Sequence, residues 1–108
     1  MRNYLGEFEE LVLLSVGILG ENAYGVTIKD EMETRTGKIP SIGALHSALN
    51  RLEKKGYIRS HEGGATSDRG GRRKRFFLLT ASGKKALVEA RDLRDTFWDA
   101  LPSNFAWE

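Results

Sequence analysis

The sequence of 108 residues contains no cysteine and only two prolines. Without cysteine the chain can form neither a disulfide nor a thiolate metal site, which fits a reducing, cytoplasmic environment. No apolar run approaches the roughly 20 residues of a membrane-spanning helix. The acidic N-terminal segment also lacks the pattern of a cleavable signal peptide. These absences exclude a disulfide scaffold and predict a protein without membrane contact.

Motifs of catalysis and of cofactor binding are also missing. The glycines within residues 63–71 are not followed by the Gly-Lys-Ser/Thr of a phosphate-binding loop, and no Gly-x-Ser-x-Gly nucleophile motif occurs. His61-Glu62 has no second histidine at helical spacing, which excludes a zinc-hydrolase site. The sequence therefore predicts that the protein is not an enzyme and uses no cofactor or metal.

Positive charge is concentrated in the middle of the chain. Residues 37–85 hold 12 Lys and Arg against 3 Asp and Glu, whereas residues 1–36 hold 3 against 7 and residues 86–108 hold 2 against 5. A basic surface attracts a polyanion even when the net charge of the chain is only +2. The distribution favours a nucleic acid as the partner of the central segment.

Hydrophobic periodicity and turn residues predict four helices and a β-hairpin. Helices are expected over residues 5–19 and 26–36, from the N-cap Ser41 to Gly56, and over 81–101. Strands are expected over 57–61 and 73–79, around a glycine-rich tip. This α-α-α-β-β-α order is typical of a winged helix-turn-helix, a mainly helical fold in which the hairpin forms the wing.

Burial can be predicted for the first three helices. The first is apolar nearly all round, which predicts a largely buried helix, and the acidic residues of the first two helices are expected to face water. The third helix has one apolar stripe. The members of the stripe are Ile42, Leu45, Ala48, Leu49 and Leu52.

The opposite face of the third helix is polar and suits a DNA major groove. Small side chains allow close approach, Ser, Asn and His can bond base edges or phosphates, and cations fix the register. An ordinary solvent-exposed helix has the same spacing, so the assignment depends on the basic segment that follows. The residues expected at DNA are Ser41, Ala44, His46, Ser47, Asn50, Arg51 and Lys54.

The hairpin after this helix is strongly basic. Cations close to phosphates release condensed counterions, and a wing can reach the DNA backbone or minor groove. The alternative is a surface hairpin that contacts only water. The position of this hairpin directly after an amphipathic helix favours contact with double-stranded DNA. The wing residues expected at DNA are Arg69, Arg72, Arg73, Lys74 and Arg75.

The predicted last helix has an apolar seam at alternating steps of four and three residues. A chain of 108 residues is too small to cover such a seam alone, which predicts a homodimer. The expected interface residues are Ala86, Ala90, Leu93, Phe97, Trp98 and Leu101. Arg94, Phe97 and Trp98 form a candidate pocket for a small aromatic effector at the dimer centre, although the two rings can simply fill the interface instead. Residues 1–80 then form the DNA-binding unit, residues 81–101 the dimerisation helix packed with it, and residues 102–108 a tail.

Several segments together resemble the PadR family of bacterial transcriptional regulators. They are LGEFE at residues 5–9, AYG at 23–25, GALHSAL with RLEKKGYI within 43–58, and GGRRKRFFLLT at 70–80. The resemblance covers about Leu5 to Leu101 and implies a dimeric winged helix that binds operator DNA, usually as a repressor, with a small-molecule inducer in some members. The chain departs from the family at residues 43–47, where Gly-Thr-Leu-Tyr-Pro is common, and its single C-terminal helix resembles the compact subgroup.

Two-fold symmetry predicts a pseudo-palindromic operator for such a dimer. The alternative function is a winged-helix protein-interaction module, in which the same basic surface docks an acidic protein. RNA binding is less favoured, because no exposed aromatic stacking platform is evident.

Overall fold

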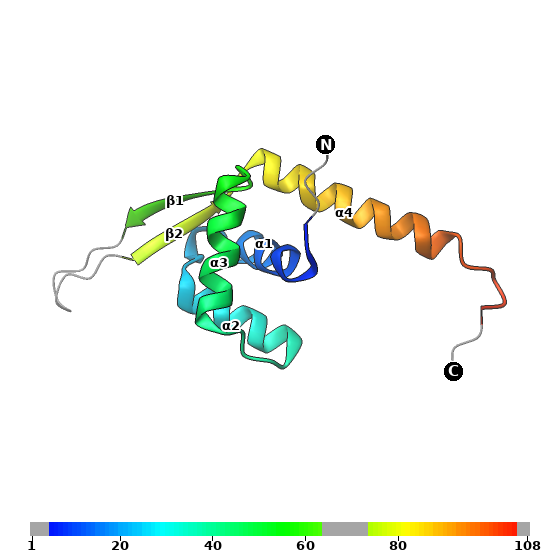
Figure 1. The fold of residues 1–108 in the computed structure, drawn as a ribbon, viewed down its shortest axis with the longest axis horizontal. Helices are drawn as coiled ribbons and strands as arrows, with labels where there is room; N and C mark the ends of the chain where they lie inside the picture. The colour runs from blue at the N-terminus through cyan, green and yellow to red at the C-terminus, as the bar shows by residue number, and fades with distance from the viewer. Residues whose placement is uncertain (1–4, 64–73, 106–108) are drawn as a thin grey trace.

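The computed structural model describes residues 5–63 and 74–105 and has the predicted order of elements (Figure 1). The helices are α1 (Glu7–Leu19), α2 (Gly25–Thr36), α3 (Ile42–Lys54) and α4 (Ala81–Asp99), with a short 3-10 helix η1 (Gly20–Asn22) after α1. Strands β1 (Ile58–Gly63) and β2 (Lys74–Leu79) pair antiparallel, from Ile58 opposite Leu79 to Gly63 opposite Lys74. The winged helix-turn-helix fold is therefore confirmed.

Helix α1 lies at the centre of the fold and packs against α2, α3, α4 and β2. Its residues Val12, Leu13 and Val16 are almost completely buried. The other buried apolar residues come from α2, α3, β1 and β2, and from Ala23 just before α2. They are Ala23, Ile28, Met32, Leu45, Ala48, Leu49, Leu52, Ile58 and Phe77.

One expectation for α1 is confirmed and one is wrong. The helix is largely buried, as expected, although Leu14 and Ile18 are 40% and 51% exposed. Its acidic residues do not all face water, because Glu9 and Glu10 are buried. The physical reason is that cations from α3 and α4 reach both carboxylates, and paired charges can be buried where single ones cannot.

The apolar stripe of α3 is confirmed except at its first member. Leu45, Ala48, Leu49 and Leu52 are buried, but Ile42 is 58% exposed. At 100° per residue, Ile42 lies about 70° around the helix from the centre of the buried four. It therefore falls outside the surface that α3 presents to the core.

The hairpin is anchored to the rest of the fold along β2. The backbone N–H of Phe77 donates to the carbonyl of Ala23 at 2.8 Å, and Tyr24 forms an isolated bridge with Phe76. The ring of Tyr24 also contacts that of Phe76 edge to face, with 5.4 Å between centroids. The base of the wing is thus fixed to the start of α2.

Caps and one close approach fix the starts of α3 and α4. The hydroxyls of Ser41 and Thr80 accept from the backbone N–H groups of Ala44 and Gly83, each at 3.0 Å, so both predicted N-caps are confirmed. Thr80 also donates to the carbonyl of Gly56 at 2.6 Å. A Cβ at Gly83 would lie 2.2 Å from the carbonyl oxygen of Tyr57, so only glycine lets α4 begin this close to β1.

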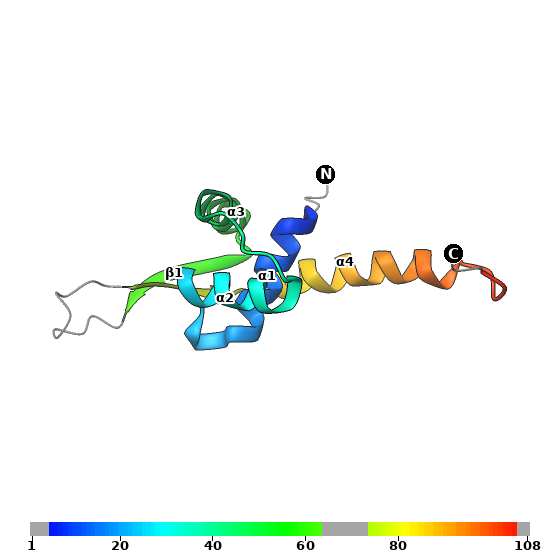
Figure 2. The ribbon, with the colours of Figure 1, turned by 90° about the horizontal axis from the view of Figure 1, so that it is seen from below.

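The molecule is elongated, with principal extents of 61 × 33 × 21 Å. The hairpin extends to one side of the three-helix body, and the C-terminal part of α4 extends to the other (Figures 1 and 2). Among the described residues, no helix combines the length and apolar character needed to cross a bilayer.

Candidate nucleic-acid interface

Helix α3 lies at one edge of the body (Figure 2), and the side chains of its polar face are exposed. All seven residues expected at DNA are exposed on it or at its cap: Ser41, Ala44, His46, Ser47, Asn50, Arg51 and Lys54. At 100° per residue, Gly43, Ser47, Asn50 and Lys54 share the centre of this face, opposite the buried stripe. The centre therefore combines a glycine, two hydrogen-bonding side chains and one cation, which is the composition suited to close approach and to base or phosphate contact.

Arg51, at the edge of this face, forms an ion pair with α1. Its Nε donates to Oε2 of Glu9 at 2.6 Å, and Nζ of Lys55 donates to Oε1 of the same carboxylate at 2.7 Å. Burial raises the pKa of Glu9, but the hydrogen bonds and charges of Lys55 and Arg51 outweigh it, so the pKa lies below its ordinary value of 4.5. Glu9 is therefore a buried, charged carboxylate with a cation on each oxygen.

The wing is joined to α3 through Glu53. The hydroxyl of Ser60 on β1 donates to Oε2 of Glu53 at 2.6 Å, and Arg75 on β2 forms an ion pair with Oε1. Arg75 also lies over the ring of Phe77, with 5.1 Å from its guanidinium carbon to the centroid. This one carboxylate thus contacts both strands of the wing and fixes the hairpin against α3.

Lys74 points to a different partner from its neighbour Arg75. Its Nζ lies 4.3 Å from the centroid of the Tyr24 ring, at the start of α2. Tyr24 and His61 both contact the ring of Phe76, the imidazole in a stacked arrangement at 5.7 Å. Of the five predicted wing cations, Lys74 and Arg75 are exposed, and Arg69, Arg72 and Arg73 lie outside the described residues.

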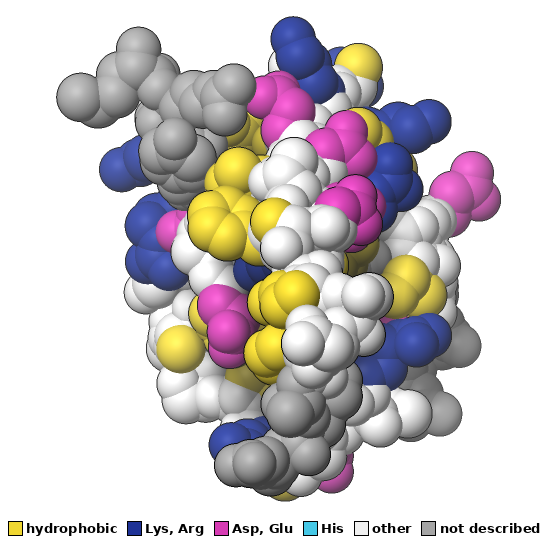
Figure 3. Space-filling view, turned by 90° about the vertical axis from the view of Figure 1, so that its right-hand side faces the viewer, with side chains coloured by type: hydrophobic (Ala, Val, Ile, Leu, Met, Phe, Trp, Pro, Cys, Tyr) yellow, Lys and Arg dark blue, Asp and Glu magenta, His cyan; other side chains and the backbone are white. Residues whose placement is uncertain are grey.

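Helix α4 exposes apolar side chains along its C-terminal half. Phe97 is 70% exposed, Trp98 is 56% exposed, and Leu93 and Leu101 are also exposed, whereas Ala86 and Ala90 are half-buried. Figure 3, seen from the side to which α4 extends, shows apolar side chains gathered among charged ones. The predicted seam is therefore available to a partner over its last turns.

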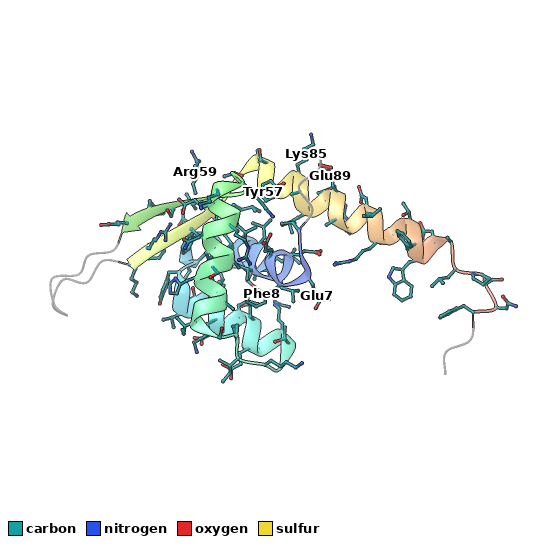
Figure 4. All side chains as sticks on the ribbon, in the orientation of Figure 1. Glu7, Phe8, Tyr57, Arg59, Lys85 and Glu89 are labelled. Atoms are coloured by element: carbon teal, nitrogen blue, oxygen red, sulfur yellow. The ribbon has the colours of Figure 1, made fainter. Side chains whose placement is uncertain are left out.

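A second side of α4 faces α1 across a groove of about 400 Å³. Leu87, Arg94 and Trp98 line it and share one side of the helix, about 100° around from Leu93 and Phe97. The remaining lining residues are Glu10, Leu14, Lys84, Val88, Arg91 and Asp95. Lys85 and Glu89 point away from α1 (Figure 4). Three residues were predicted to form an effector pocket. Arg94 and Trp98 line this groove, and Phe97 is not among its lining residues.

Arg94 is held in this groove by a bidentate ion pair. Its NH1 and NH2 groups lie 2.8 Å from Oε2 and Oε1 of Glu10, a geometry that is among the strongest between side chains. Contacts of Glu9, Glu10 and Glu53 with other elements were not expected from the sequence. Glu9 and Arg51 are 42 residues apart and Glu10 and Arg94 are 84 apart, so no local spacing indicates either pair.

Residues 13–89 match the transcriptional regulator PadR-like family. A transcriptional regulator from Clostridium thermocellum is 26% identical over 84% of this chain and 85% of its own, with a TM-score of 0.69.

Two further solved structures are similar. RosR from H. salinarum is 26% identical over 91% of this chain and 81% of its own, with a TM-score of 0.71. A PadR family transcriptional regulator from Eggerthella lenta shares the fold, with a TM-score of 0.66, 23% identity, and coverage of 86% of this chain and 80% of its own. None of the curated proteins matches this sequence closely enough to count as a relative.

Proposed function

This chain belongs to the PadR-like family of transcriptional regulators, and we propose that it acts as a homodimeric repressor on a pseudo-palindromic operator. The observation that carries the proposal is the uncovered polar face of α3 beside a basic hairpin. A helix of this width fits the major groove, where base edges can be read. The proposed role is binding and regulation rather than catalysis.

Within the interface, the contacts divide into two kinds. Ser47 and Asn50 lie at the centre of the exposed face and are assigned to base edges, with Ser41, Ala44 and His46 nearby. Lys54 follows on the same side and is assigned to phosphate, as are the wing cations. The first group supplies sequence preference, and the second supplies affinity without much preference.

The dimer is proposed to form along α4. Phe97 and Trp98 are large rings that water surrounds for most of their surface in the single chain. Burying such area against a second copy is favourable at about 25 cal/mol per Å². A two-fold axis at α4 then presents two copies of α3 to successive major grooves, about 34 Å apart.

The groove between α1 and α4 is proposed as the site of an apolar or aromatic effector. Leu14, Leu87 and Trp98 provide apolar walls, and the ion pair of Arg94 with Glu10 provides polar groups in the lining. A ligand induces release only if it binds the DNA-incompetent form more tightly than the DNA-bound form. Titration with planar aromatic compounds should quench Trp98 fluorescence, in a Trp107→Phe background that removes the second tryptophan. Rings that only fill the dimer interface would give no quenching.

Selection of duplexes from a random pool, followed by affinity measurements at several salt concentrations, tests DNA binding directly. The expected product is a pseudo-palindrome with half-sites roughly one helical turn apart. Asn50→Ala should change the preferred sequence, whereas Lys54→Ala should weaken all duplexes alike and reduce the log–log salt slope by about 0.9. No duplex binding, together with salt-sensitive binding of an acidic protein, would favour the protein-interaction function instead.

A further inference from the structure

We infer that Glu9 is a positioning residue for DNA recognition: its carboxylate holds α3 at a fixed angle to α1, and Arg51 acts through Glu9 rather than on a phosphate. The inference rests on the proposed function, because it concerns how the same helix meets DNA. It reassigns Arg51, whose position on the exposed side of α3 predicted a phosphate contact.

The contacts around Glu9 fill the carboxylate. One oxygen accepts from Arg51 and the other from Lys55, at 2.6 and 2.7 Å. Both donors come from the last turn and C-cap of α3, and Glu9 comes from the first turn of α1. Because the two donors lie one turn apart along α3, their bonds to one carboxylate restrain the tilt of α3 relative to α1, as well as its distance from α1.

Charge gives a reason for two cations instead of one. An unpaired buried carboxylate is costly, and near DNA it would also repel the phosphates. Arg51 and Lys55 together outweigh the negative charge of Glu9, so the cluster has an excess of positive charge and does not repel phosphates. Removing Glu9 would release Arg51 beside the surface that meets DNA, so a role in positioning and a role in phosphate contact predict opposite effects on DNA affinity.

The neighbouring residue Glu10 extends the restraint to α4. Successive residues on a helix point about 100° apart, so Glu9 reaches α3 while Glu10 reaches Arg94 on α4. Figure 4 marks the start of this turn by Glu7 and Phe8. In the proposed dimer α4 is next to the two-fold axis, so this turn of α1 sets how far apart the two copies of α3 lie.

The experiment compares Glu9→Gln with Glu7→Gln, the same substitution at an exposed position of the same turn. Each variant is titrated with the duplex preferred by the wild type and with one whose half-sites are a base pair further apart. Glu9→Gln should weaken binding to the preferred duplex by about 2-fold to 30-fold and reduce its preference over the respaced one. Glu7→Gln should match the wild type in both measurements.

A merely structural role for Glu9 would lower affinity for both duplexes equally and leave the preference unchanged, which would overturn the inference. Equal or tighter binding by Glu9→Gln would also overturn it. Arg51→Gln should leave the salt slope unchanged and add no loss when combined with Glu9→Gln; a slope reduced by about 0.9 would show a phosphate contact instead.

Lys55→Gln removes one of the two bonds and repeats the test if Glu9→Gln does not fold. It should reduce the spacing preference in the same direction, and an unchanged preference would overturn the inference. A wild type that binds no duplex overturns the proposed function, and this inference with it. A wild type that binds while Glu9→Gln behaves like Glu7→Gln overturns this inference alone.

Discussion

Helices α3 and α4 are both amphipathic, but the rest of the chain buries most of the apolar side of α3 and only the start of α4. The apolar stripe of α3 is buried from Leu45 to Leu52, and beyond Ile42, Gly43 and Ala44 in the first turn, the exposed residues of the helix are polar. Helix α4 is covered at its start, where Gly83 is buried, and leaves Leu93 and Phe97 exposed. The free side of α3 is therefore suited to water and DNA, and the free side of α4 to another protein surface.

Helix α1 connects the two. Adjacent carboxylates in its first turn bind Arg51 on α3 and Arg94 on α4. The surface proposed to contact DNA and the surface proposed to contact a second subunit are thus both held by α1. This arrangement gives a physical route by which assembly along α4 can affect DNA recognition by α3.

The largest expected effect comes from placing charge on the exposed side of α4. The double variant Leu93→Glu/Phe97→Glu should be monomeric in sedimentation experiments, because carboxylates cannot be buried in the seam without partners. Loss of the second recognition helix should weaken operator binding by at least about 100-fold. Thr96→Glu adds one carboxylate about 100° around the helix from Phe97 and should remain dimeric. A dimeric double variant would contradict the assignment of the seam.

The anchored start of α4 should be sensitive to a single methyl group. Gly83→Ala would place a Cβ 2.2 Å from the Tyr57 carbonyl oxygen and 2.7 Å from a Leu79 methyl, so backbone must shift. We expect a loss of about 1–3 kcal/mol in the free energy of unfolding, measured by denaturant titration. Gly43→Ala on α3 meets nothing within 4 Å and should instead stabilise the fold by up to about 1 kcal/mol. Equal changes in the free energy of unfolding for Gly83→Ala and Gly43→Ala would show that the start of α4 is no more tightly packed than the exposed face of α3.

Acid should weaken the link between α1 and α3. The pKa of Glu9 is lowered in the folded protein, so its contribution to stability is present above about pH 4.5 and is lost as the pH falls through the lower, folded value. The stability difference between wild type and Glu9→Gln should therefore shrink on acidification. Unfolding curves measured between neutral and acidic pH test this. A difference that stays constant would show that the charge of Glu9 contributes nothing.

The smallest effect is expected at the exposed end of the α3 stripe. Ile42→Ala should change the free energy of unfolding by no more than about 0.5 kcal/mol, because most of the side chain is already in water. Leu45→Ala, one turn along and fully buried, should cost about 2–5 kcal/mol. Comparable losses in the two variants would show that Ile42 is covered in solution.

Local patterns in the sequence were sufficient for the fold. Periodicity gave the four helices, and hydroxyl side chains at Ser41 and Thr80 marked two N-caps that the structure contains. The exposed polar side of α3 followed from the same periodicity. These features depend on neighbours within one or two helical turns, which is the range over which a sequence pattern is informative.

The parts that escaped prediction are all long-range. Glu9 and Glu10 looked like solvated acids because their partners lie in α3 and α4, far along the chain. Ile42 matched the spacing of a stripe, but the core does not extend to its side of the helix. The seam of α4 was recognised, whereas the side lined by Leu87 and Arg94 depends on where α1 packs.

The most direct test of the account is the number of chains that bind one operator duplex. Sedimentation velocity with a labelled duplex, selected as described above, measures that stoichiometry together with the assembly of the free protein. We expect a dimer in the absence of DNA and two chains on each duplex. In Leu93→Glu/Phe97→Glu the free protein should be monomeric, and the complex of two chains with the duplex should not form. A wild type that stays monomeric at micromolar concentration, or that binds the duplex as one chain, would contradict it.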